Sequence, residues 1–203
     1  MVDKKIFKNT VLKIIELAGE DGIGAVKLNK CLIICDAVHK ALYGDSLTGA
    51  TYIKHKYGPV PETEADDILQ ELKTSGDIDI RKKMVSPGIY ENTHYLCQGL
   101  EVSKKFFSDE EISIITWAVS TIMPMTAQQI TEISHNRCYH NTPMLKEINL
   151  DDKAKWYLHD LRPIVMSLLS NPNASINIRE LQDIYERINK SSHKNQEIDN
   201  INQ

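Results

Sequence analysis

The chain has 203 residues, 41% of them hydrophobic, which is enough to bury a core of its own. Its formal net charge of −4 excludes a global basic field that would hold nucleic acid without sequence preference. The longest purely apolar run, about Cys31 to Cys35, is far shorter than the roughly 20 residues of a membrane helix. The opening MVDKKIFKNT is charged and lacks the features of a signal peptide, so we expect a cytoplasmic protein.

Hydrophobic residues at helical spacing predict three helices in the first third of the chain. The expected ranges are 4–18, 26–43 and 62–74, and Gly44 is well placed to end the second helix. Between the second and third helices, residues 51–57 are expected to be extended. A turn should follow them, because proline fixes φ and restricts the residue before it.

Two β-type runs come next, at residues 78–85 and 89–96. The Ser86-Pro87-Gly88 stretch between them is typical of a hairpin turn. The order of elements to this point predicts a mainly α fold: a compact helical domain with a small β-hairpin, in an α+β, winged-helix-like order.

Capping boxes predict where two further helices begin. Ser108 with Glu111 opens a helix to about Met123, and Thr126 with Gln129 opens a short helix to about His135. Irregular chain is expected over residues 136–149. Extra C-terminal helices are expected at 151–169 and 175–190, and the polar tail after Ser191 is expected to be disordered.

The sequence offers two candidate metal-ligand clusters, and neither is compelling. Cys31, Cys35 and His39 share one helix face beside Asp36, but the leucines on the same stripe favour thiols that fill a core. The spacing of the second cluster matches no familiar zinc pattern. Its members are His135, Cys138 and His140.

The four cysteines show no disulfide framework, and we find no nucleophile elbow, phosphate-binding glycine loop or HExxH run. We therefore predict no enzyme, no metal and no cofactor.

Residues 27–61, KLNKCLIICDAVHKALYGDSLTGATYIKHKYGPVP, resemble the signature of the Panacea domain, the SocA-like antitoxin family. The matches run from KLNK through DxxH and YG to TGATY and YGPVP, and ITEISHN at 130–136 is similar to the family's ExSH element. The resemblance covers roughly residues 5–140. Between Cys31 and Cys35 the sequence differs from the family signature, but each difference replaces one apolar residue with another. After Asn136 it also lacks the acidic, Trp-containing continuation of the family.

The resemblance implies an antitoxin that neutralises a toxin, encoded by a neighbouring gene, through direct binding, in a bacterium or phage. It divides the chain into a Panacea domain at 1–145, a helical extension at 146–190 and a tail at 191–203. The expected partner is a cognate protein toxin, and self-association stays open. Two alternatives remain: an adaptor that delivers the toxin to a protease, and a DNA-binding autoregulator, against which the net charge of −4 argues.

The candidate partner-binding or motif residues all come from this signature. They are Lys27, Asn29, Lys30, Asp36, His39, Tyr52, Lys54, Lys56, Tyr57, Gly58, Pro59 and Pro61.

Alternation along an extended strand predicts that Tyr52, Lys54 and Lys56 form an exposed basic face, with His55 and Tyr57 packed on the opposite side. In the other interpretation, Tyr57 and the prolines only lock the turn against the preceding helix. Asp36 and His39 are spaced to share a neighbour, and we expect a buried polar network that braces the turn through Tyr52 or a backbone amide.

Overall fold

A computed structural model describes residues 3–62, 64–135 and 137–150. In this part of the chain the α-helices are Lys4–Ala18 (α1), Ala25–Tyr43 (α2), Glu64–Thr74 (α3), Asp109–Ile122 (α4), Ala127–Ser134 (α5) and Arg137–Asn141 (α6), with a 3-10 turn at Lys104–Phe106. The strands are Ile23–Gly24 (β1), Tyr52–His55 (β2), Gly58–Pro61 (β3), Ile78–Ser86 (β4) and Ile89–Leu96 (β5).

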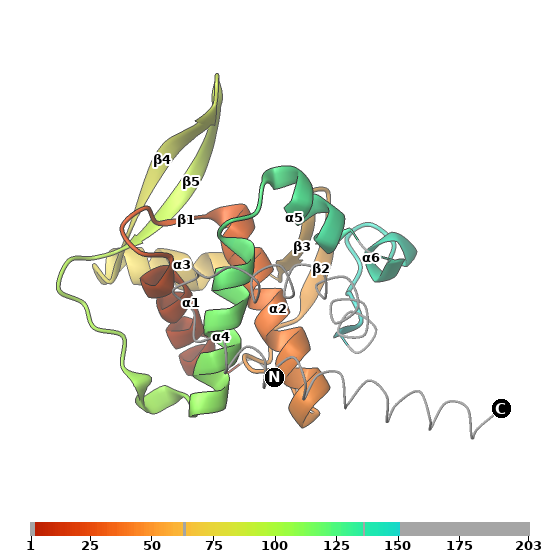
Figure 1. Cartoon of the computed structure of the whole chain (residues 1–203), viewed down its shortest axis with the longest axis horizontal. Helices are drawn as coiled ribbons and strands as arrows, with labels where there is room; N and C mark the ends of the chain where they lie inside the picture. The colour runs from red at the N-terminus through yellow and green to blue at the C-terminus, as the bar shows by residue number, and fades with distance from the viewer. Residues whose placement is uncertain (1–2, 63, 136, 151–203) are drawn as a thin grey trace, which may run out of the picture.

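The strands form two small antiparallel sheets on different sides of the helices (Figure 1). One has the order β1-β5-β4, and the other is the β2–β3 hairpin. The β4–β5 hairpin, predicted from the sequence, turns at Pro87-Gly88. The second sheet lies where we expected only an extended run and a turn.

The mainly α class is therefore wrong, and the fold is α+β. About half of the described residues are helical and about a fifth lie in strands. The strands that the sequence analysis missed carry no β pattern, since β1 has two residues and β3 is a Gly-Pro-Val-Pro run. Proline is tolerated in β3 because the strand lies at the edge of its sheet, where a missing N–H breaks no ladder.

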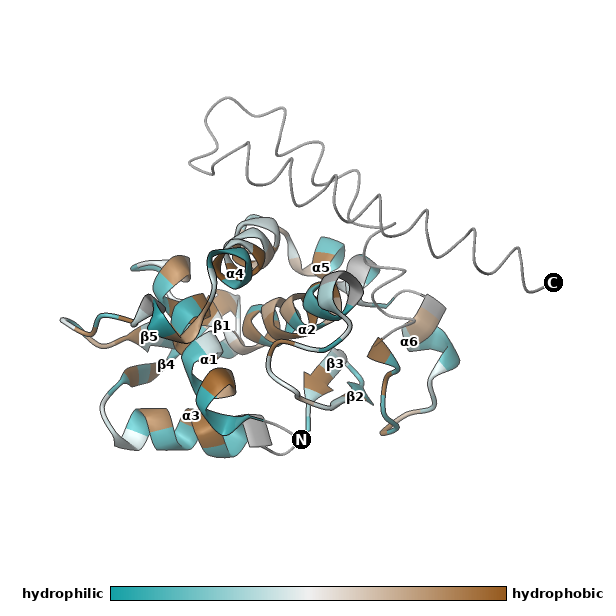
Figure 2. Ribbon diagram, turned by 90° about the horizontal axis from the view of Figure 1, so that it is seen from below, coloured by the Kyte–Doolittle hydropathy of each residue, from teal (hydrophilic) through white to brown (hydrophobic). Residues whose placement is uncertain are grey.

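Helix α2 is the centre of the core, with α4 packed on one side and β3 on another. All of its residues from Cys31 to Val38 are buried. Figure 2 shows α2 as largely hydrophobic, whereas the outlying α3 alternates hydrophobic and hydrophilic bands. Full burial of a leucine or isoleucine contributes about 1.5–3 kcal/mol, so the buried side chains of α2 contribute substantially to stability.

Local signals placed the helix ends well. Both capping boxes form, at Ser108 with Glu111 and at Thr126 with Gln129, and Gly44 ends α2 in the left-handed conformation. Residues 137–141 form α6, where irregular chain was expected. The helices expected at 151–169 and 175–190, and the polar tail, lie outside the described residues. No helix in the described ranges is long and apolar enough to cross a bilayer.

Candidate partner-binding site

The signature segment, which we define as Tyr52–Pro61, is the β2–β3 hairpin with its turn at Lys56 and Tyr57. Tyr52 pairs with Pro61, and His55 pairs with Gly58. The turn that we expected at the prolines therefore lies two residues earlier, and the prolines belong to the returning strand.

A buried lysine explains the glycine and first proline of this segment. Lys30 of α2 is only 2% exposed, and its Nζ donates a hydrogen bond of 2.9 Å to the Pro59 carbonyl oxygen. Gly58 has φ +102°, and a Cβ placed there would lie 2.3 Å from Lys30 Nζ and 3.1 Å from Ser134 Oγ. Only glycine permits this close approach, which brings Lys30 of the KLNK motif against the Gly-Pro of the hairpin.

A buried carboxyl group holds the first strand of the hairpin. Asp36 accepts hydrogen bonds from the Thr48 amide (2.7 Å), the Thr48 hydroxyl (2.6 Å) and the Tyr52 hydroxyl (2.7 Å). Burial raises the pKa of Asp36 above its ordinary value, and the hydrogen bonds from Thr48 and Tyr52 oppose that shift. The network predicted between Asp36 and Tyr52 is confirmed.

His39 does not join that network, so this part of the prediction is wrong. Its Nδ1 lies 2.7 Å from the Asp45 carbonyl oxygen, and its ring lies 4.8 Å from the ring of Tyr43. Glu111 of α4 is also close, at 3.7 Å from Nε2. Asp36 faces the hairpin, whereas His39, one helical turn further on, faces the end of α2 and the start of α4.

The remaining KLNK residues serve the helix rather than the hairpin. Lys27 Nζ donates a 2.6 Å hydrogen bond to the Met123 carbonyl oxygen, which ties the start of α2 to the end of α4. Asn29 is half-buried on α2.

The predicted faces of the signature segment are also wrong in part. Tyr52 is fully buried rather than exposed, because its hydroxyl reaches Asp36. Lys54 is half-buried, with its ammonium 4.4 Å from the centre of the Tyr139 ring. Tyr57, expected to pack inside, is 66% exposed beside Lys56.

Residues 142–148, expected to be irregular, cover the other edge of β2. The amide of Leu145 donates to the Lys54 carbonyl oxygen (2.9 Å), and the amide of Ile148 donates to the Tyr52 carbonyl oxygen (2.8 Å). The Lys54 amide in turn donates to the Lys146 carbonyl oxygen (2.9 Å). β2 is thus hydrogen-bonded on both edges.

Tyr139 of α6 fixes the turn end of the hairpin, since its hydroxyl donates to the His55 carbonyl oxygen at 2.7 Å. No local pattern predicts these contacts, because they join residues more than 80 positions apart.

Three large apolar side chains stay exposed around this hairpin. They are Tyr57 (66%), Met144 (54%) and Leu145 (63%). Leu145 is also the one non-glycine residue with a positive φ, +59°, in the described part of the chain. We call Lys56, Tyr57, Met144 and Leu145 the Tyr57 surface.

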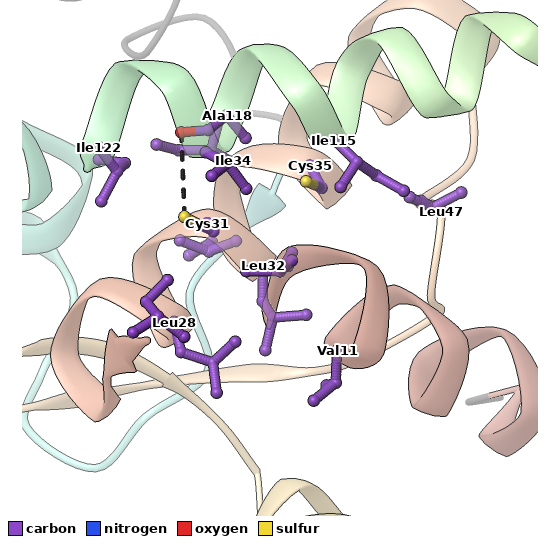
Figure 3. Packing of buried hydrophobic residues seen from close by; sticks show 14 of the residues in the cluster. Val11, Leu28, Cys31, Leu32, Ile34, Cys35, Leu47, Ile115, Ala118 and Ile122 are labelled. Atoms are coloured by element: carbon purple, nitrogen blue, oxygen red, sulfur yellow. Dashed lines mark hydrogen bonds between the residues drawn. The ribbon is translucent and has the colours of Figure 1, made fainter. Parts of the chain in front are cut away.

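The cysteines of α2 belong to the core. The Sγ of Cys31 lies 3.9 Å from the Ala118 carbonyl oxygen. Figure 3 shows Cys31 facing Ala118 and Cys35 beside Ile115. Burial raises the pKa of both thiols, which favours the protonated form over the thiolate that a metal needs.

The second candidate cluster is organised by packing. Cys138 Sγ lies 3.7 Å from the Asn149 carbonyl oxygen, and the His135 ring stacks on Tyr139 with centroids 4.1 Å apart. Within residues 3–150, where described, no three His, Cys, Asp or Glu side chains are grouped to hold a metal ion.

Fold and site together define a small α+β domain whose signature residues support a hairpin with an exposed turn. A family model described as "Antitoxin SocA-like, Panacea domain" matches residues 28–140, and the chain belongs to this family. The family suggests a non-enzymatic, regulatory role and a toxin as the partner. Searches of curated proteins and of solved structures returned no match.

Proposed function

We propose that this protein is an antitoxin that neutralises a protein toxin by direct binding, with the Tyr57 surface as part of the contact. One observation carries the proposal: the family signature is used inside the fold to hold the β2–β3 hairpin, while the side chains of Lys56 and Tyr57 at its turn are exposed. Lys30 and Asp36 are buried beneath it, while Tyr57 is 66% exposed.

The hairpin is well suited to binding because its backbone is already ordered. Hydrogen bonds from β3, from residues 145–148 and from Tyr139 hold β2 and its turn in place. A preorganised loop loses little conformational entropy when a partner binds. Tyrosine at such a position is the type of residue that most often anchors an interface.

The backbone of Leu145 supports the same surface. A leucine in the left-handed region costs roughly 1–2 kcal/mol, and exposing its side chain to water gains nothing in return. Strained residues of this kind cluster at ligand-contact sites. A partner that covers Leu145 would bury the side chain that this backbone conformation holds outward.

Co-expression tests the proposal. Expression of the neighbouring gene alone should arrest growth, and expression of this chain with it should restore growth. The two proteins should also purify together, because the proposed mechanism is direct binding. Rescue without co-purification, together with a protease-dependent fall in toxin level, would contradict simple neutralisation. A neighbouring gene that is harmless alone would contradict the antitoxin function itself.

A further inference from the structure

The outer half of the β4–β5 hairpin is a bare arm. We define the β4–β5 arm as residues 81–90, and all ten of them are exposed. Figure 1 shows it extending away from the helices. The base of the same hairpin is well anchored, since Ile78, Thr93 and His94 are buried. The hairpin thus has a buried foot and an exposed end, and Lys83 Nζ donates a long hydrogen bond of 3.4 Å to the Asp21 carbonyl oxygen at the inner part of the arm.

The end of the arm is strongly apolar. Four large hydrophobic side chains are each between 52% and 63% exposed. They are Met84, Val85, Ile89 and Tyr90. Met84 pairs directly with Tyr90 across the two strands, and Val85 and Ile89 are their chain neighbours, so all four residues lie at the end of the hairpin. A contiguous exposed apolar patch of this kind usually marks an interaction site.

The arm is also cationic. It carries Arg81, Lys82 and Lys83 and no carboxylate, in a chain whose net charge is −4. The acidic residues that flank it are occupied: Asp79 accepts a 2.6 Å hydrogen bond from Arg81, and Glu91 accepts one of 3.0 Å from the Val26 amide at the start of α2. Lysines on an edge strand also deter aggregation, but that role does not account for the apolar end beside them.

The backbone of the arm is open to pairing. In the order β1-β5-β4, the outer edge of β4 has no neighbour among the described strands, and β1 covers β5 only at Thr93 and His94. A partner strand can therefore add to either edge of the arm, a recurrent mode of protein recognition.

Charge separates the classes of partner. A nucleic acid would satisfy the cations of the arm but offers no apolar groove for the four exposed hydrophobic side chains at its end. A second copy of the chain would bring the ammonium groups of Lys82 and Lys83 from two arms together, whereas Arg81 is already paired with Asp79. A protein with an acidic rim around an apolar groove satisfies both the charge and the hydrophobic end.

We propose that the β4–β5 arm is a second binding element, which inserts its apolar end into an acid-rimmed groove of the toxin. This inference rests on the antitoxin function proposed above. It predicts that the toxin is held at two places, the Tyr57 surface and the arm.

The test measures the affinity of purified full-length variants for the purified product of the neighbouring toxin gene. Lys82→Glu/Lys83→Glu and, separately, Ile89→Ser should each weaken binding by about tenfold or more. The lysine pair should also reduce the dependence of affinity on salt. Since these side chains are exposed, circular dichroism melting curves should match those of the wild type.

The matched control is Lys4→Glu/Lys105→Glu, which reverses two exposed lysines away from the arm and should leave affinity unchanged. If wild type binds and the arm variants bind equally well, the arm inference is overturned and the antitoxin function stands. If wild type does not bind the toxin at all, the proposed function fails and the arm inference falls with it.

Two further binding measurements test other classes of partner. The Lys82→Glu/Lys83→Glu variant is also tested against a promoter DNA fragment and against phosphatidylcholine–phosphatidylserine vesicles. If this variant loses binding to the DNA or to the vesicles but keeps its affinity for the toxin, the inference is overturned in favour of a nucleic acid or a membrane.

Discussion

At the residue scale, the Asp36 network determines how α2 holds the hairpin. One carboxyl group satisfies the Thr48 amide and two hydroxyl groups, all of them buried. Removing a buried acceptor leaves each of these donors with its full desolvation penalty, which is larger than the net value of a hydrogen bond. Loss of the Asp36 carboxyl group should therefore destabilise the protein by more than the net stabilisation of its hydrogen bonds.

We predict that Asp36→Ala lowers the free energy of unfolding by about 3 kcal/mol, whereas Asp36→Asn costs less than half as much. Asparagine keeps an acceptor for the Thr48 amide and avoids burying a charge. Urea denaturation of both variants measures the difference. A stable Asp36→Ala protein that no longer neutralises the toxin would contradict this structural role and indicate direct contact.

The same carboxyl group predicts a pH dependence. Burial raises the pKa of Asp36, so the unfolded chain loses this proton at a lower pH than the folded protein does. Its contribution to stability is fully present below the ordinary aspartate pKa of about 3.9 and is lost as pH rises through the raised value. The unfolding free energy of wild type relative to Asp36→Asn should therefore fall as pH rises across this window. A difference that grows instead would mean that the hydrogen bonds outweigh burial.

At the element scale, the contact between β3 and α2 depends on one glycine. Gly58 combines a positive φ with a site that Lys30 Nζ already fills, whereas Gly76 has a positive φ (+78°) and open space around it. Substituting Gly58 and Gly76 in turn therefore separates the energetic cost of the backbone conformation from the cost of close packing.

We predict that Gly58→Ala destabilises the protein by about 3 kcal/mol and Gly76→Ala by about 1 kcal/mol. The difference arises because the new methyl group must displace a buried ammonium from its carbonyl partner. Thermal or urea unfolding measures both. Equal losses in the two variants would show that the Lys30 contact tolerates the extra atom.

Elements whose signals are local were predictable, and those that depend on distant contacts were not. The capping boxes at Ser108 and Thr126 and the Ser-Pro-Gly hairpin turn need only neighbouring residues. The β2–β3 pair was missed because prolines argue against a strand unless its position at a sheet edge is known. Pairing of residues 145–148 with β2 has no sequence signal, because it joins segments about 90 positions apart.

At the scale of the whole molecule, α2 connects the parts of the site. Its Lys30 reaches β3, its Asp36 reaches β2, and its cysteines fill the core against α4. The signature was recognisable as a family pattern from sequence alone, and so was the Asp36–Tyr52 link. The sequence did not predict which tyrosine faces solvent. The side of β2 that packs depends on Asp36 and residues 142–148 rather than on strand alternation.

The central claim is that the Tyr57 surface binds the toxin, and isothermal titration with the purified product of the neighbouring gene tests it most directly. The comparison is wild type, Tyr57→Ala, and Tyr43→Ala as a matched control in another exposed tyrosine. We predict that Tyr43→Ala binds like wild type and that Tyr57→Ala binds about tenfold more weakly, with unchanged melting curves. Equal affinity of all three proteins, or no binding by wild type, would contradict the account.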